Sequence, residues 1–175
     1  MKFNTKTIHG GQKHEETTGS VMPPVFLTST FAQSSPGQHK GYAYARGTNP
    51  TRTALEANFA ALENGTRAFA FASGMAAIDA VLRLLKPGDE VIAGDDLYGG
   101  TYRMFTQLFK KYGLEFSFVN MNKVANVTNA ITSKTKLVWI ETPTNPLMKI
   151  ANIYKITTNV KEENSEILIA VDNTF

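Results

Sequence analysis

The spacing of apolar residues changes several times along the chain, and each change predicts a new element. After Asn49 and Pro50, apolar residues at Leu55, Phe59 and Leu62 fall on one side of a helix. Asn is a preferred N-cap residue, and Pro is favoured at the first helical position. The pattern therefore predicts a helix that begins at Pro50.

A short apolar run at residues 69–72 stops at Ser73-Gly74, and apolar residues then recur with helical spacing as far as Leu85. This order predicts a strand, a tight turn and a helix. Gly74 lets the backbone approach a ligand closely, and the free N–H groups and dipole of a helix N-terminus favour an anion such as a phosphate. A turn that binds nothing is the alternative interpretation.

Strands and helices are predicted to alternate through the rest of the chain. Strands are expected at residues 90–93, 114–119, 136–140 and 166–171. Helices are expected after Gly99-Gly100, within residues 123–134 and over residues 151–163. The first of these helices is expected to end at Gly113, with four inward side chains: Phe105, Leu108, Phe109 and Tyr112. The alternation predicts an α/β fold with a mainly parallel sheet flanked by helices.

Residues 1–50 show no clear period and contain several Gly and Pro residues. We interpret them as an extended N-terminal arm without a core of its own, and a neighbouring subunit is one surface on which it could lie. The predicted organisation is this arm followed by an α/β domain over residues 51–175. The histidines are scattered within the arm, so no metal site is predicted: His9, His14 and His39.

Composition is that of a globular protein, because 42% of the 175 residues are hydrophobic and 19% are charged. The net charge is +3 and the charges are interspersed, so no nucleic-acid partner is expected. The absence of cysteine excludes disulfides, thiolate metal sites and a cysteine nucleophile. No apolar run is long enough to span a membrane, and the expected location is the cytoplasm.

Polar residues follow several of the predicted strands. They are Ser73-Gly74-Met75, Asp95–Tyr98, Asn145 and Asp172. Ligands of parallel α/β sheets bind beyond the carboxyl ends of the strands, where these groups would meet. A phosphorylated pyridine needs such a set: an anion site, an aromatic ring to stack on, a carboxylate at the ring nitrogen and a donor to the phenolic oxygen. With its nitrogen protonated, such a ring is an electron sink.

Each candidate also has a purely structural interpretation. Asp172 could cap a strand end, Tyr98 could only pack, and Asn145 could be a turn residue. Arg46 could be a solvated surface charge, and Ser73 could bond only the backbone of its turn. A nucleotide-binding domain is a further alternative, although the chain contains neither a Gly-x-Gly-x-x-Gly motif nor a Walker lysine motif.

Five motifs resemble a known family. They are residues 44–52 (YARGTNPTR), 71–75 (FASGM), 94–101 (GDDLYGGT), 141–146 (ETPTNP) and 171–175 (VDNTF). In this order they resemble the N-terminal part of the pyridoxal 5′-phosphate (PLP) enzymes of cysteine and methionine metabolism. The resemblance implies an aspartate-aminotransferase-like large domain of fold type I. It also implies a Schiff-base lysine and a C-terminal domain that the motifs do not include. We therefore expect an N-terminal portion, which alone would not complete turnover.

The resemblance implies cofactor-binding roles for nine residues: Tyr44, Arg46, Ser73, Gly74, Met75, Tyr98, Asn145, Asp172 and Thr174. The N–H groups of Gly74 and Met75 would bind the phosphate, which Tyr44 and Arg46 would reach from a neighbouring subunit. Active sites would then be shared in a homodimer or homotetramer.

Tyr98 would stack on the cofactor ring and act as the catalytic residue of this portion by moving a proton. Asn145 would contact the ring hydroxyl, and both side chains would contact the substrate. Asp172 would pair with the ring nitrogen, with Thr174 beside it.

The implied activity is PLP-dependent trans-sulfuration, in which C–S bonds of sulfur amino acids are made or broken. Cystathionine γ-synthase or γ-lyase is the leading expectation, with cystathionine β-lyase or O-acylhomoserine sulfhydrylase next. A non-catalytic PLP-binding or regulatory module is the alternative from another class. Two positions bear on the substrate. Ala43 stands where several relatives that use cystathionine have an acidic residue, and Gly100 stands where methionine γ-lyases tend to have cysteine.

Overall fold

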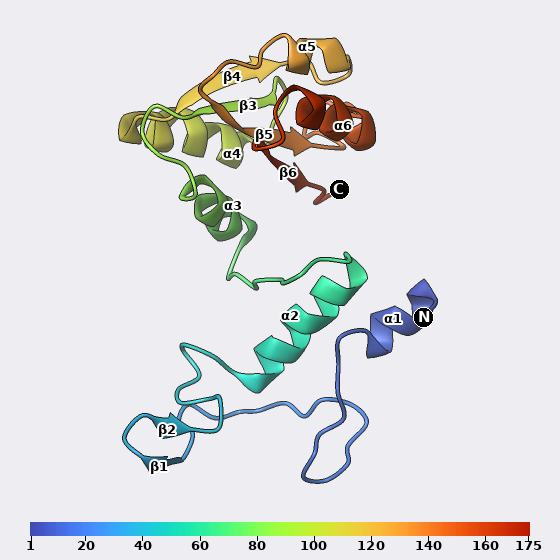
Figure 1. Ribbon diagram of the computed structural model, residues 1–175, viewed down its shortest axis with the longest axis vertical. Helices are drawn as coiled ribbons and strands as arrows, with labels where there is room; N and C mark the ends of the chain where they lie inside the picture. The colour runs from blue at the N-terminus through green and yellow to red at the C-terminus, as the bar shows by residue number, and fades with distance from the viewer. The chain divides into compact units, whose positions relative to one another are not determined.

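The computed structural model describes all residues from 1 to 175 and divides into two compact units, Met1–Ala72 and Ser73–Phe175 (Figure 1). The first unit contains helices α1 (Phe3–His9) and α2 (Pro50–Leu62) and the short hairpin of β1 (Gln33–Ser35) and β2 (Gln38–His39). No helix in the chain is long and apolar enough to cross a membrane.

Helix α2 begins as predicted from the sequence. Pro50 is its first residue, and the side chain of Asn49 accepts a hydrogen bond of 2.8 Å from the backbone N–H of Thr51. Leu55 and Phe59 on its apolar side are about half exposed. The helix therefore begins with a satisfied cap but buries none of its residues.

The arm contains more structure than the sequence pattern predicted, because residues 3–9 form helix α1. Hydrogen bonds join this helix to α2. The ammonium of Lys6 donates to the carbonyl of Ala61, and the side-chain amide of Asn58 donates to the carbonyls of Lys6 and Gly10. Polar contacts thus join α1 to α2, two helices far apart in the sequence.

The second unit is a parallel four-stranded sheet with helices on both faces. Its strands are β3 (Glu90–Gly94), β4 (Glu115–Val119), β5 (Thr135–Glu141) and β6 (Leu168–Asp172), in the order β4-β3-β5-β6. Its helices are α3 (Gly74–Leu82), α4 (Gly99–Arg103), α5 (Val124–Thr128) and α6 (Ile153–Glu163). Every strand pair in this sheet is parallel, which confirms the predicted α/β class.

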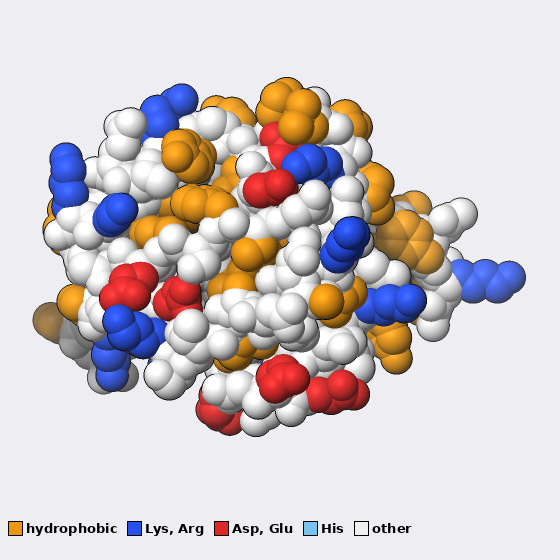
Figure 2. Space-filling model, turned by 90° about the horizontal axis from the view of Figure 1, so that it is seen from above, with side chains coloured by type: hydrophobic (Ala, Val, Ile, Leu, Met, Phe, Trp, Pro, Cys, Tyr) orange, Lys and Arg blue, Asp and Glu red, His pale blue; other side chains and the backbone are white.

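Alternate residues of the two central strands pack on opposite faces of the sheet, as the strand period of two requires. On β3, Val91 and Ala93 share one hydrophobic cluster with α3 and with the two helical turns after α4, Met104–Leu108 and Phe109–Tyr112. Ile92 shares the other cluster with α5 and α6 (Figure 1). Burial on both faces explains why β3 and β5 are continuous apolar runs. At the surface, charged side chains of both signs are spread over the face seen in Figure 2.

Two local predictions were wrong. Residues 69–72 form no strand, because no neighbouring strand pairs with them, and the N–H of Ala70 instead donates to the Glu56 carboxylate. Both aromatic side chains of this segment, Phe69 and Phe71, are exposed.

The helix that follows Gly100 does not keep one period. α4 continues as a π-helical turn at Met104–Leu108 and a 3₁₀ turn at Phe109–Tyr112. Phe105 and Phe109 are buried as predicted, but Leu108 and Tyr112 are exposed, because the changes of helix type interrupt the regular helical period. Gly113 ends the segment as predicted, in the left-handed conformation with φ of 86°.

Candidate functional site

A cavity of about 340 Å³ lies at the carboxyl ends of β5 and β6 in the second unit. Seven of the predicted site residues line it: Ser73, Gly74, Met75, Tyr98, Asn145, Asp172 and Thr174. Four further residues complete the lining: Ile78, Glu141, Pro143 and Phe175. The folded chain therefore brings together, in one cavity, residues up to about a hundred positions apart in the sequence.

One end of the cavity is the N-terminus of α3. The Ser73 hydroxyl accepts from the N–H of Ala76, and the Ser73 carbonyl accepts from the N–H of Ala77, both at 3.2 Å. The N–H groups of Gly74 and Met75 have no acceptor within the chain. Ser73 thus caps the helix and leaves two donors free for an anion, which the helix dipole also favours.

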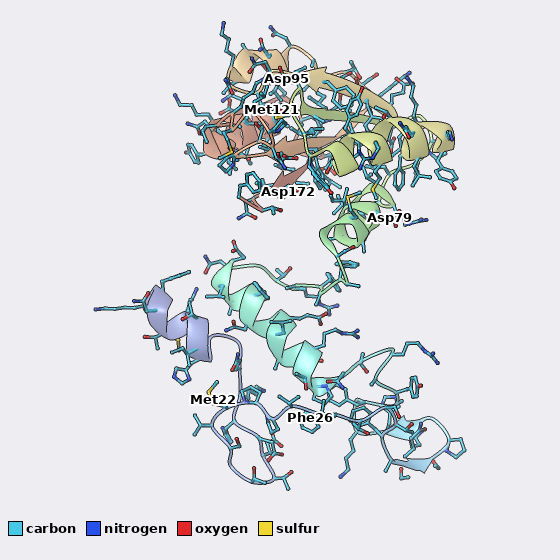
Figure 3. The ribbon with its side chains drawn as sticks, turned by 180° about the vertical axis from the view of Figure 1, so that it is seen from behind. Met22, Phe26, Asp79, Asp95, Met121 and Asp172 are labelled. Atoms are coloured by element: carbon cyan, nitrogen blue, oxygen red, sulfur yellow. The ribbon has the colours of Figure 1, made fainter.

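Asp172 contributes a carboxylate at the end of β6 (Figure 3). The N–H and hydroxyl of Thr174 donate to its Oδ1 atom, at 3.1 and 2.6 Å. Its Oδ2 atom has no donor within the chain. The carboxylate is therefore oriented by Thr174 and keeps one oxygen for a cationic N–H group of a ligand.

The ring of Tyr98 needs the glycine two residues later. A Cβ atom at Gly100 would overlap Cε1 of this ring and would lie 3.0 Å from the sulfur of Met75. Tyr98 itself is 46% exposed and lines the cavity immediately before α4. Glycine at position 100 thus leaves the space in which the aromatic ring lies beside the cavity.

Asn145 lies in the loop after β5, and a buried carboxylate from the loop after β3 holds that loop. Asp96 accepts from the hydroxyl of Thr144 and, at 3.0 Å, from the N–H of Leu147. Beside it, Asp95 forms an ion pair of 2.9 Å with Lys149. Both aspartates therefore bond the segment after β5. The Asn145 side chain makes no hydrogen bond within the chain.

Glu141 is a cavity residue that was not singled out from the sequence. It ends β5, is 6% exposed, and accepts hydrogen bonds from the backbone N–H groups of Tyr98 and Asn145. Burial raises the pKa of Glu141; the two N–H donors oppose this shift, and the charges of Asp172 and Asp96 add to it. A carboxylate that directly follows a buried apolar strand was the signal available in the sequence.

Two predicted site residues belong to the first unit and do not line this cavity. The guanidinium of Arg46 lies over the ring of Tyr44, with 4.9 Å between its Cζ atom and the ring centroid. Both side chains are exposed. Their contribution to a neighbouring subunit's site stays a prediction.

The groups around the cavity fit a flat, phosphorylated, cationic ring. Two free N–H groups suit the phosphate, the free Asp172 oxygen suits a protonated ring nitrogen, and the Tyr98 ring offers an aromatic face. A parallel α/β domain with this arrangement is typical of PLP-dependent enzymes. The family model described as "Cys/Met metabolism PLP-dependent enzyme" matches residues 4–175, and the chain belongs to this family. The resemblance noted in the sequence is confirmed, and PLP is the cofactor of the family.

The names of the individual relatives give different activities. The chain is 50% identical over 174 residues to cystathionine beta-lyase of Coxiella burnetii, covering 99% of the chain and 44% of the relative. It is 49% identical to a probable cystathionine gamma-synthase of Herpetosiphon aurantiacus, over 99% of the chain and 54% of that relative. The crystal structure of cystathionine gamma-lyase from Lactobacillus plantarum, complexed with L-serine, superposes with a TM-score of 0.90 at 44% identity, covering 99% and 45%. The chain thus spans about half the length of the curated relatives that it matches.

Proposed function

We propose that the whole protein is a PLP-dependent trans-sulfuration enzyme and that its cofactor binds in the cavity of the second unit. The observation that supports this most is that three polar groups of the cavity lining have no hydrogen-bond partner within the chain: the N–H groups of Gly74 and Met75, and the Oδ2 atom of Asp172. When bound, PLP supplies an electron sink for a carbanion at the substrate.

The residues of this chain would bind and orient that group. Gly74 and Met75 donate to the phosphate, and Asp172, oriented by Thr174, keeps the ring nitrogen protonated. Tyr98 covers the ring and holds a phenolic proton near the reacting carbon. Asn145 presents a free amide to the ring hydroxyl and to the substrate carboxylate.

A binding measurement on the 175-residue protein tests the cavity. Pyridoxamine 5′-phosphate is the suitable probe, because it has no aldehyde that could react with lysines at random. We expect saturable binding that the substitution Asp172→Asn weakens about tenfold or more, because a charge-assisted hydrogen bond is lost. Asp79→Asn is the matched control, since Asp79 pairs with Arg83 outside the cavity. Equal affinities of the two variants would contradict the proposal.

For the whole protein, we propose cystathionine γ-synthase or γ-lyase activity, with β-lyase or O-acylhomoserine sulfhydrylase activity as the alternative. Product analysis separates them. With water, cleavage of cystathionine at the γ carbon yields cysteine, 2-oxobutanoate and ammonia, whereas cleavage at the β carbon yields homocysteine, pyruvate and ammonia. A synthase consumes an O-acylhomoserine and cysteine, and a sulfhydrylase uses sulfide. PLP binding without any of these products would indicate the non-catalytic module.

We further propose a cytoplasmic homodimer or homotetramer in which Tyr44 and Arg46 reach the phosphate bound by the neighbouring subunit. The exposure of both side chains in the first unit supports this. Mixing inactive Arg46→Ala and Asp172→Asn subunits of the whole protein should restore activity, because each mixed dimer then has one intact site. Absence of recovery in demonstrably mixed dimers would contradict shared sites.

A further inference from the structure

Glu141 connects two loops of the candidate site. Its Oε1 atom accepts from the N–H of Tyr98 at 3.1 Å and from the N–H of Asn145 at 3.0 Å, and its Oε2 atom lies 3.0 Å from the same Tyr98 nitrogen. Tyr98 follows β3 through a short loop, whereas Asn145 follows β5. No other side chain of the chain bonds the backbone of both residues.

The position of Glu141 in the sheet makes this contact rigid. Glu141 is the last residue of β5 and pairs in register with Asp172, the last residue of β6. Its side chain is buried and lines the same cavity as the two residues that it holds. A side chain at the end of a central strand therefore determines where two loop segments, one before α4 and one after β5, present their groups.

The charges around Glu141 are mostly negative. Asp172 faces it from β6 and Asp96 from the loop after β3, and both raise its pKa. On another side, Glu141 shares a small cavity with the ion pair of Asp95 and Lys149. The phenol of Tyr98 is the remaining titratable group at the cavity. A carboxylate in such surroundings costs free energy when ionised, and the N–H groups of Tyr98 and Asn145 compensate for part of this cost.

We propose that Glu141 is a positioning residue, whose carboxylate fixes Tyr98 and Asn145 relative to Asp172 so that all three groups can address one ligand. The positioning itself is a property of the free protein. Only the identity of the ligand rests on the proposed function.

Two substitutions remove the contacts of the Glu141 carboxylate to different extents. Glu141→Ala removes the contacts to both residues. Glu141→Gln keeps the acceptor oxygen that Tyr98 and Asn145 share but replaces the second oxygen, which only Tyr98 approaches, with an NH₂ group. Glu90→Gln is the matched control, because Glu90 is also a buried glutamate of this sheet, bonded to the hydroxyls of Ser117, Thr132 and Thr135 and outside the cavity.

Amide NMR spectra of the ligand-free protein test the positioning directly. The amides of Tyr98 and Asn145 should titrate together, with a midpoint above the ordinary glutamate pKa of about 4.3, and this titration should vanish in Glu141→Gln and persist in Glu90→Gln. Glu141→Gln should shift the Tyr98 amide more than that of Asn145. Affinity for pyridoxamine 5′-phosphate should fall about tenfold in Glu141→Ala and less in Glu141→Gln.

The outcomes separate this inference from the proposed function. If the amides titrate as expected but the wild type does not bind the probe, positioning stands and the PLP site fails. If the amide titration survives in Glu141→Gln, or if this variant binds the probe as Glu90→Gln does, the inference is overturned. Because the titration uses the wild type and the conservative variant, the test remains decisive even if Glu141→Ala does not fold.

Discussion

At the residue scale, glycine stands at positions 74 and 100 beside the cavity for two different physical reasons. Gly100 is required by packing, because a side chain there would overlap the Tyr98 ring. Gly74 is not required by packing, since a Cβ atom at this position would meet nothing within 4 Å. We infer that the glycine at this helix N-terminus serves a ligand that approaches the backbone closely.

Substitutions at the adjacent residues Gly99 and Gly100 test whether the Tyr98 ring requires glycine at position 100. Gly99→Ala should leave stability unchanged or raise it by up to about 1 kcal/mol, because the new methyl meets only the end of the Arg103 side chain at 3.3 Å. Gly100→Ala should lower stability by about 1–3 kcal/mol and displace the Tyr98 ring. Urea unfolding measures the first effect, and ring proton shifts of Tyr98 measure the second. Identical behaviour of the two variants would show that the ring does not lie there.

The substitution Gly74→Ala tests whether a ligand approaches the backbone closely at position 74. We expect an unchanged free energy of unfolding, because the site is open, and about tenfold weaker binding of pyridoxamine 5′-phosphate, because the methyl takes space at the phosphate. Pyridoxamine without its phosphate should bind wild type and variant alike. An unchanged affinity for the phosphorylated probe would place the phosphate elsewhere.

Which residues meet at the cavity was predictable only in part. Ser73, Tyr98, Asn145 and Asp172 follow apolar runs, and a residue at a strand end is recognisable from the sequence. Glu141 was not identified, because its burial and its bonds to two distant N–H groups arise from tertiary contacts. For the same reason, only the structure shows that the Ser73 hydroxyl accepts a capping hydrogen bond from the N–H of Ala76.

At the element scale, the two central strands β3 and β5 were predictable because burial on both faces makes them continuous apolar runs. Residues 69–72 have the same pattern but form no strand, since a strand also needs a neighbour to accept its hydrogen bonds. The segment after Gly100 shows the other limit. A fixed helical period predicted Leu108 inside, but Leu108 ends a π-helical turn and is exposed.

Glu90 connects three elements at the amino end of the sheet, and its pKa gives a prediction of pH dependence. Burial acts to raise the pKa of Glu90, but the hydroxyls of Ser117, Thr132 and Thr135 together with Lys134 outweigh it, so the pKa lies below its ordinary value. A depressed carboxyl pKa stabilises the fold above the unfolded-state pKa of about 4.3, and this contribution is lost as the pH falls through the folded-state pKa.

The substitution Glu90→Gln should therefore cost stability at neutral pH, and the difference from wild type should narrow below about pH 4. Urea unfolding across this pH range measures it. The contribution of Glu141 to stability depends on pH in the opposite direction. Because its pKa is raised, its contribution is fully present below the unfolded-state pKa and is lost as the pH rises through the folded-state pKa. A pH-independent difference for Glu90→Gln would contradict the assigned bonds.

At the scale of the whole molecule, the second unit contains both hydrophobic clusters and the entire cavity lining. We predict that residues 73–175 alone unfold cooperatively in urea and bind pyridoxamine 5′-phosphate within about tenfold of the 175-residue protein. The first unit would then contribute mainly through Tyr44 and Arg46 between subunits. A fragment without a cooperative transition would show that the sheet depends on the first unit.

The most direct test of the account is a titration of the ¹⁵N-labelled protein with pyridoxamine 5′-phosphate, followed at the amides of Gly74, Met75 and Thr174. The first two report on the phosphate, and the Thr174 amide, bonded to Asp172, reports on the ring nitrogen. We predict that all three signals shift and saturate at the same ligand concentration, and that pyridoxamine without its phosphate shifts only Thr174. Signals that saturate at different concentrations, or a response at one end only, would contradict a single ring held between Gly74 and Asp172.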